Sequence, residues 1–205
     1  KVWSMEKIIK DGKETELVIE EILTENNLTK DEIVYTSHDK KGKLFQGTLK
    51  EVTVYKKTDI NDVIKEFLKE IIENMGLEVS FETTTKDERT TIKMYSNNNP
   101  IVIGKNGHTL KALETLAKQK IQNDTGIFYK INLDVSNYKE RIQKSIERLA
   151  KITAKEVAKT KIPVALDNMT SYERRIVHNV LTDFKGVKTE SEGEEPNRHV
   201  VIKPE

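Results

Sequence analysis

The chain has 205 residues, and its 35 basic and 34 acidic side chains leave a net charge of only +1 although 34% of the residues are charged. The absence of cysteine excludes disulfides and thiolate metal sites and fits a reducing cytoplasm. No apolar run approaches the ~20 residues of a membrane-spanning helix, so we expect a cytoplasmic protein with room for up to three small domains.

Residues 1–57 have the pattern of a small β-α-β-β domain. Apolar residues recur at helical spacing in the expected helix and alternate in the later strands. The expected strand, helix, strand and strand cover residues 5–10, 14–26, 32–37 and 48–55. A domain of this size would be only marginally stable alone.

A basic loop at residues 40–47 lies between the last two expected strands of this domain. It carries two large apolar side chains, Leu44 and Phe45, among three lysines. A loop this short and basic is not expected to lie in a core. We therefore expect Leu44 and Phe45 to form a docking tip for a protein partner.

Residues 58–137 predict the order α-β-β-α-α-β, which is the arrangement of the bacterial-type KH domain. The sequence Asn97–Pro100 interrupts the chain ahead of the two middle helices. The first helix is expected at residues 59–75, and the three strands at 77–83, 90–95 and 127–135. The last helix is expected to end at residues 124–126. The segment has a net charge of −2, so any contact with nucleic acid would be local.

The most informative motif is Gly104-Lys105-Asn106-Gly107, which follows three β-branched apolar residues and precedes an amphipathic helix. Glycines at a helix N-terminus let another backbone approach closely, and the N–H groups and helix dipole favour an anion there. Such a loop can hold a sugar-phosphate backbone, as the GxxG loop of KH domains does. The alternative is a tight turn between two packed elements.

Residues 138–205 begin with a long helix that is expected to reach residue 160. Basic side chains at steps of three or four residues share one face, namely Arg141, Lys144, Arg148, Lys151, Lys155 and Lys159. An apolar face is expected from Ile142, Ile146, Leu149, Thr153 and Val157. Eight basic residues oppose three acidic ones between 139 and 161. This basic stripe is either a solvated face or an auxiliary nucleic-acid contact, together with Arg175 and Arg198.

A second motif follows at the start of the next expected helix. Thr170 and Glu173 fit a capping box, which places Arg174 and His178 one turn apart. We expect both side chains to face solvent, where a guanidinium can grip phosphate and an imidazole can add a hydrogen bond or a stacking face. The alternative is a structural pair in which Arg174 bridges to Asp183 or to a C-terminal glutamate.

Residues 170–202 resemble the R-three-H domain, named for its Arg-x-x-x-His, including the turn at Ser191–Pro196 before a final strand. Together with the KH segment, and with Lys41–Gly47 similar to a K-K-G-x-F-G loop, the whole chain resembles the bacterial Jag family, also called the SpoIIIJ-associated or KhpB/EloR family. The resemblance implies an α+β chain of three domains, at 1–57, 58–137 and 138–205. It departs from the family pattern at Asn106, where a basic residue is frequent, and at His199, where a second arginine is common.

The resemblance implies a single-stranded RNA-binding protein that acts as an RNA chaperone or post-transcriptional regulator in cell elongation, division and peptidoglycan homeostasis. Residues 104–107 would form the KH contact loop, and Arg174 and His178 the second contact site. Single-stranded DNA is an alternative ligand. The expected protein partners are a small single-KH (KhpA-like) protein, a second copy of the chain, and a membrane-associated protein at the N-terminal domain.

Two other classes of function compete with this interpretation. The chain has four histidines and neither a metalloprotease helix motif nor a Walker-type phosphate loop, so we expect no enzyme activity, cofactor or metal. The stronger rival is a protein–protein adaptor that docks at membrane-associated cell-envelope machinery through its N-terminal domain. Leu44 and Phe45 are the residues that favour this rival.

Overall fold

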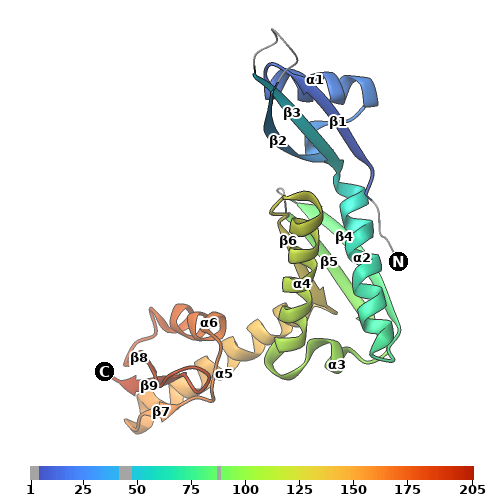
Figure 1. Ribbon diagram of the computed structural model, residues 1–205. Helices are drawn as coiled ribbons and strands as arrows, with labels where there is room; N and C mark the ends of the chain where they lie inside the picture. The colour runs from blue at the N-terminus through green and yellow to red at the C-terminus, as the bar shows by residue number, and fades with distance from the viewer. Residues whose placement is uncertain (1–4, 42–47, 87–88) are drawn as a thin grey trace. The chain divides into compact units, whose positions relative to one another are not determined.

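The computed structural model describes residues 5–41, 48–86 and 89–205, which form two compact units (Figure 1). Unit 1 covers Lys1–Ser136 and unit 2 covers Asn137–Glu205. The described residues form three separate three-stranded sheets, two in unit 1 and one in unit 2. The mixed α+β class and the predicted order of elements are confirmed.

The N-terminal part of unit 1 is an antiparallel sheet with one helix packed on it. Its main elements are β1 (Lys7–Gly12), α1 (Thr15–Asn26), β2 (Ile33–Lys41) and β3 (Thr48–Lys56), with β3 in the centre of the sheet. Ile22 of α1 and the β3 residues Val52 and Val54 are fully buried in its core. Strand β1 extends two residues beyond its predicted end at residue 10, because Gly12 still pairs with Lys50 of β3.

The second part of unit 1 has the α-β-β-α-α-β order of a KH domain. Its elements are α2 (Lys57–Asn74), β4 (Val79–Lys86), β5 (Arg89–Ser96), α3 (Asn99–Ile103), the 3-10 turn η2 (Lys105–Gly107), α4 (His108–Thr125) and β6 (Ile131–Val135). The sheet order is β4-β5-β6, with β4 antiparallel and β6 parallel to β5. Both long helices contact the sheet, α2 at β4 and α4 at β6, and they contact each other.

Helix α2 follows β3 without a linker, since Lys56 ends the strand and is the N-cap of the helix. Its apolar residues at steps of four are all fully buried, and they are Ile60, Ile64, Leu68 and Ile72. Each such side chain contributes about 1.5–3 kcal/mol when it leaves water. This row explains why the amphipathic pattern predicted the helix within about two residues at its N-terminal end.

Strand β6 is shorter than the sequence predicted. It begins at Ile131, where pairing with Thr90 of β5 starts, rather than at Ile127. Before it, Phe128 is 81% exposed, while Tyr129 is buried and its hydroxyl donates to Asn61 Oδ1 at 3.1 Å and meets Thr90 Oγ1 at 3.0 Å. The alternating apolar pattern therefore starts before the point where pairing with the parallel strand β5 begins.

Unit 2 packs two helices against a small antiparallel sheet. Its elements are α5 (Tyr138–Thr160), β7 (Val164–Ala165), α6 (Ser171–Leu181), β8 (Val187–Glu192) and β9 (His199–Pro204), with β9 between β7 and β8. The fully buried core residues include Ala150, Ala154 and Val157 of α5, Val177 of α6, and Val200 and Ile202 of β9.

The buried face of α5 differs from the predicted face at one position. Leu149 is 43% exposed, whereas Ala150 and Ala154 are fully buried. Small alanine side chains let α6 and β9, which α5 contacts, come close to the helix backbone. A pattern that counts only large apolar residues therefore shifts the predicted face by part of a turn.

Candidate nucleic-acid interface

The loop between α3 and α4 has a backbone that requires glycine at its first position. Gly104 has φ 72° and ψ 176°, and its N–H donates to Pro100 O at 2.9 Å to close α3. A Cβ at Gly104 would lie 2.1 Å from Thr109 Oγ1 and 2.9 Å from the Thr109 nitrogen. Any side chain here would collide with the first turn of α4.

The last two loop positions are both left-handed. Asn106 has φ 52° and ψ 27°, and Gly107 has φ 76° and ψ 13°. Asparagine is one of the few side chains that tolerate this region, since its short polar group can bond locally. The backbone conformation therefore accounts for asparagine at position 106.

The loop presents polar groups outward at the start of α4. Lys105 and Asn106 are exposed, and the N-cap residue Gly107 has no side chain that could cap the helix. The positive end of the helix dipole and the first-turn backbone therefore face the loop. His108 and Lys111 on the first turns of α4 are also exposed. Neither residue is predicted from the sequence as part of the site, although both lie in the first turns after the second glycine.

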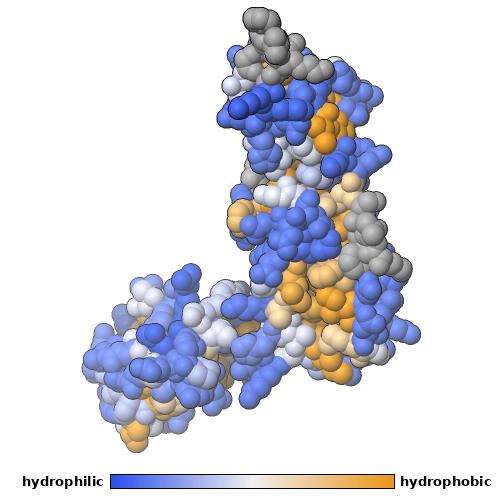
Figure 2. Space-filling model, viewed as in Figure 1, coloured by the Kyte–Doolittle hydropathy of each residue, from blue (hydrophilic) through white to orange (hydrophobic). Residues whose placement is uncertain are grey.

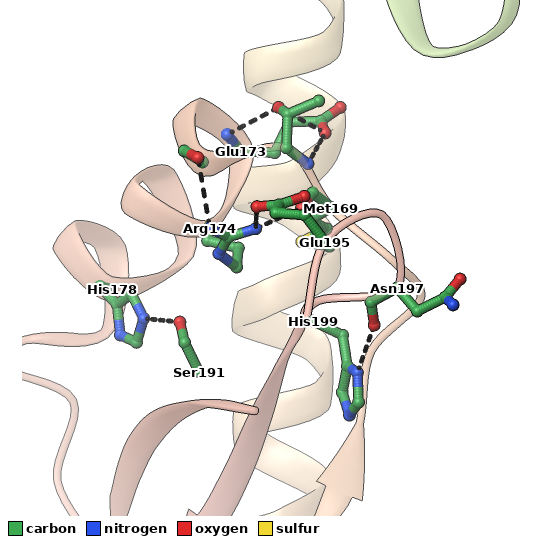
Figure 3. A network of polar contacts seen from close by, with 10 residues as sticks. Met169, Glu173, Arg174, His178, Ser191, Glu195, Asn197 and His199 are labelled. Carbon is green, nitrogen blue, oxygen red and sulfur yellow. Dashed lines mark hydrogen bonds and ion pairs between the residues drawn. The ribbon is translucent and has the colours of Figure 1, made fainter. Parts of the chain in front are cut away.

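Arg174 is buried, which makes the expectation that it faces solvent wrong. It is 8% exposed, and its Nη1 donates to Met169 O at 2.7 Å and to Glu195 Oε1 at 2.8 Å (Figure 3). Its Nη2 lies 3.3 Å from Ser171 Oγ. The physical reason is that a buried guanidinium needs partners, and the segment before α6, the start of α6 and the loop after β8 supply them. The alternative of a bridge to a C-terminal glutamate describes this contact, with Glu195 as the partner.

His178 uses both ring nitrogens within the fold. Nε2 lies 2.8 Å from Ser191 Oγ (Figure 3), and Nδ1 lies 2.7 Å from Thr189 Oγ1. The two contacts hold α6 against β8. Burial, and then the nearby charge of Arg174, lower the pKa of His178 below its usual value. The imidazole is half-buried rather than fully turned to solvent.

The predicted capping box at the start of α6 is confirmed. Thr170 N–H donates to Glu173 Oε2 at 2.7 Å, and Glu173 N–H reaches Thr170 Oγ1 at 3.4 Å. This cap fixes where the helix begins. Because Arg174 follows immediately, its guanidinium turns back toward the chain segment that ends at Met169.

The basic stripe lies on the exposed face of α5, and all six of its members are exposed. Lys144 forms an ion pair with Glu140 at 2.6 Å. Arg175 on α6 and Arg198 before β9 are exposed as well. The face of unit 2 that Figure 2 shows is largely hydrophilic. Leu44 and Phe45 lie outside the described residues.

The residues that the structure describes hold no group of three or more His, Cys, Asp or Glu side chains that could bind a metal ion. No helix among them is long and apolar enough to span a membrane.

Comparison with known proteins identifies the segments around both motifs. The family model for the KH domain of KhpA/KhpB matches residues 61–133, and the model for the R-three-H domain matches residues 144–204. The chain is 32% identical over 203 residues to the RNA-binding protein KhpB of Clostridium symbiosum, which covers 97% of this chain and 91% of that protein. The chain belongs to the KhpB family.

Other members of the KhpB family align over different lengths. The RNA-binding protein KhpB of Bacillus subtilis (strain 168) is 30% identical over 206 residues, covering 97% of this chain and 98% of its own. The relative from Lactiplantibacillus plantarum is 32% identical over 137 residues, covering 67% of this chain and 42% of its own. The resemblance to the Jag family is confirmed, with residues 104–107 inside the KH match and Arg174 and His178 inside the R-three-H match.

Proposed function

We propose that this chain binds single-stranded RNA and that residues 104–107 hold the sugar-phosphate backbone. The observation that carries the proposal is a loop with three residues of positive φ, Gly104, Asn106 and Gly107, set against the N-terminus of α4. Relatives at 32% and 30% identity are named RNA-binding proteins, which supports RNA as the ligand. Single-stranded DNA remains the alternative ligand for the same loop.

The loop binds the backbone through charge and close approach. The small loop residues let phosphate reach the start of α4, where the helix dipole favours an anion. Lys105 adds a positive charge, and Asn106 adds an amide that can donate a hydrogen bond. Exposed His108 and Lys111 extend the same surface along the first turns of α4. Bases would remain free for stacking or edge contacts.

Arg174 and His178 contribute to this function by position rather than through direct contact. Arg174 holds the loop after β8 through Glu195, and His178 holds β8 through Thr189 and Ser191. Both side chains keep the R-three-H segment folded, so that its basic side chains stay exposed on the surface. This assignment replaces the direct phosphate contact that the motif suggested.

The biological role proposed for the chain is that of an RNA chaperone or post-transcriptional regulator in the cytoplasm, connected to cell elongation, division and peptidoglycan homeostasis. This part rests on the Jag-family resemblance. Fluorescence localisation of the tagged chain and sequencing of crosslinked RNA test it. Membrane-bound fluorescence with no crosslinked RNA would contradict it.

A KhpA-like protein with a single KH domain is the proposed protein partner, and a second copy of the chain is the alternative. Large apolar side chains that remain exposed in the KH segment support a partner, and they are Met75, Ile101, Leu116 and Phe128. An apolar area between α4 and α2 is visible on the face in Figure 2. The adaptor hypothesis is not favoured, and its Leu44 and Phe45 tip stays a prediction.

The test of the GxxG proposal is a double substitution, Lys105→Asp with Asn106→Asp, in the full chain. Added negative charge should repel phosphate, and we expect affinity for an unstructured uridine oligomer to fall by about 100-fold, because a favourable contact becomes repulsive. Fluorescence anisotropy measures the affinity, and thermal unfolding checks that the fold is kept.

The chain offers a matched control in the N-terminal part of unit 1. Asn27 is also exposed and left-handed, with φ 52°, and Lys30 is exposed nearby. Asn27→Asp with Lys30→Asp changes the net charge by the same amount. These two residues lie in the β1-β3-β2 part of unit 1, away from the KH sheet. Equal loss in both variants would mean a general charge effect, and unchanged binding in the loop variant would refute the proposed KH function.

A further inference from the structure

The outer face of α5 carries a charge row that the GxxG proposal does not use. The stripe from Arg141 to Lys159 spans about 27 Å at the helical rise of ~1.5 Å per residue. A shallow hollow along this face is lined by Lys144, Glu147, Arg148, Lys151, Ile152 and Lys155. The row is straight because one continuous helix supports it.

Most of this row is left without acidic partners. Arg148, Lys151 and Lys155 form no ion pair with any residue that the structure describes, whereas Lys40 and Lys203 are each bridged by two carboxylates. Like charges three or four residues apart on a helix repel one another. A chain with 34 acidic residues could have neutralised this face. The uncompensated row therefore indicates an external anion with repeated charges.

The row lacks what single-strand recognition uses. Single-stranded nucleic acid is held by aromatic side chains on which bases stack, whereas double-stranded RNA is recognised by shape and by phosphate and 2′-hydroxyl contacts. The sequence has no Phe, Tyr or Trp from residue 139 to residue 171. A row of basic side chains without aromatic residues can contact the phosphates even when the nucleobases are paired and stacked inside a duplex.

We propose that the outer face of α5 binds the backbone of double-stranded RNA, as a second class of ligand beside the single strand at the GxxG loop. The inference rests on the proposed RNA-binding function and specifies a second site for it. It also gives the chain a way to hold a paired region and an unpaired region of RNA at separate surfaces.

An anionic membrane surface fits this face less well than RNA does. A helix that lies in a bilayer interface needs a broad apolar face to insert. The apolar face of α5 packs into the core of unit 2, where Ala150, Ala154 and Val157 are fully buried. Leu149 and Ile152 are the large apolar side chains of α5 that are exposed beside the basic row, at 43% and 54%. Two side chains do not make an inserting face, so membrane binding is an outcome of the test and not the proposal.

The test uses the full chain and a blunt-ended RNA duplex of about 16 base pairs, a length that one double-strand-binding module spans. The variant is Arg148→Gln, Lys151→Gln and Lys155→Gln. We expect duplex affinity to fall about tenfold or more, and the slope of log K against log salt to flatten by about 2–3, since each lost phosphate contact is worth roughly 0.7–0.9. A charge-preserving variant, Lys151→Arg with Lys155→Arg, should bind as the parent does.

The matched control removes three exposed lysines elsewhere that form no ion pair with a described residue, through Lys7→Gln, Lys13→Gln and Lys30→Gln. It should leave the salt slope unchanged. If the control and the stripe variant lose affinity equally, the row has no special role and the inference fails. Loss of vesicle binding (phosphatidylserine with phosphatidylcholine) in the stripe variant, with duplex binding intact, would also overturn it.

The two proposals fail in distinguishable ways. The Lys105→Asp, Asn106→Asp variant should lose the uridine oligomer and keep the duplex, whereas the stripe variant should lose the duplex. A parent chain that binds the oligomer but not the duplex refutes only the α5 site. A parent chain that binds neither RNA refutes the proposed function itself.

Discussion

The GxxG loop and the Arg-x-x-x-His pair are two short motifs with the same predicted role, and their structures differ in one decisive respect. In the loop, the backbone is strained into left-handed conformations while the side chains of Lys105 and Asn106 remain exposed. In the pair, the backbone is ordinary helix while Arg174 and His178 are bonded to groups of their own domain. One motif leaves its polar side chains exposed, and the other bonds them within its own domain.

A motif can therefore be required for the shape of a domain rather than for contact with a ligand. A buried guanidinium that binds a carbonyl and a carboxylate contributes to folding, and its loss would weaken binding indirectly. A loop without Cβ atoms lets a ligand come close to the protein backbone, and the loss of that space would weaken binding directly. Substitutions that separate stability from affinity therefore test the comparison at each motif.

The largest expected effect is that of Gly104→Ala. The added Cβ meets Thr109 Oγ1 at 2.1 Å and φ is 72°, so both a collision and backbone strain oppose the native loop. We expect a loss of about 2–4 kcal/mol of unfolding free energy in unit 1 and loss of single-strand RNA binding. Denaturant unfolding and anisotropy titration measure the two quantities.

Gly76→Ala is the matched control for that substitution. Gly76 has φ 77°, but a Cβ there meets no atom within 4 Å. It should lose only the strain, about 1–2 kcal/mol, and keep RNA affinity. If Gly104→Ala is no more destabilising than Gly76→Ala and binds RNA normally, the tight approach of the loop to α4 has no functional role.

The next effect is that of Arg174→Ala, which should lower the unfolding free energy of unit 2 by about 2–3 kcal/mol. The side chain is nearly buried and its loss leaves Met169 O without its donor, although Glu195 is 57% exposed and can be hydrated. Arg175→Ala, at the exposed neighbouring position, should change stability by less than about 0.5 kcal/mol. Thermal unfolding compares the two variants.

RNA affinity then separates contact from position for Arg174. At a temperature where the Arg174→Ala chain remains folded, we expect it to bind a uridine oligomer nearly as well as the parent chain does. A large loss of affinity with unchanged unfolding temperature would show that the guanidinium leaves Glu195 to grip phosphate. That result would restore the direct contact that the sequence motif suggested.

Periodic elements could be predicted from the sequence because their pattern is local. The range 138–160 was predicted for α5 and agrees with the structure, and the capping box placed the start of α6 correctly. The GxxG loop was recognised because its glycines and flanking apolar residues are contiguous. Its role in binding stays a prediction.

The orientation of Arg174 could not be predicted in the same way. Helical spacing gives its neighbours on α6, but its partners are a carbonyl before the helix and a carboxylate 21 residues later. The same limit explains Phe128, since β6 begins where its pairing with the start of the parallel strand β5 begins, and the local pattern does not decide this. Long-range pairing decides which face is inside, and a single sequence does not contain it.

The smallest expected effect concerns the pH dependence of unit 2 stability through His178. Burial and the charge of Arg174 lower the pKa of His178 in the folded state, whereas the unfolded side chain titrates near about 6.5. The unfolded state therefore binds the proton first as pH falls. Stability from neutral His178 is fully present above the unfolded pKa and is lost as pH decreases from there toward the folded pKa.

The measurement is the unfolding temperature of the parent chain and of His178→Gln between about pH 7.5 and pH 4.5, a range that brackets the unfolded pKa of histidine. Because the other three histidines are common to both chains, the difference curve isolates His178. Glutamine can still bond to one of the hydroxyls of Thr189 and Ser191, so the substitution should cost only a few degrees at neutral pH. We expect that gap to shrink as the solution becomes acidic, since protonation already penalises the parent chain. A gap that widens on acidification would mean that the folded state prefers charged His178, and the imidazole would then be available to phosphate after all.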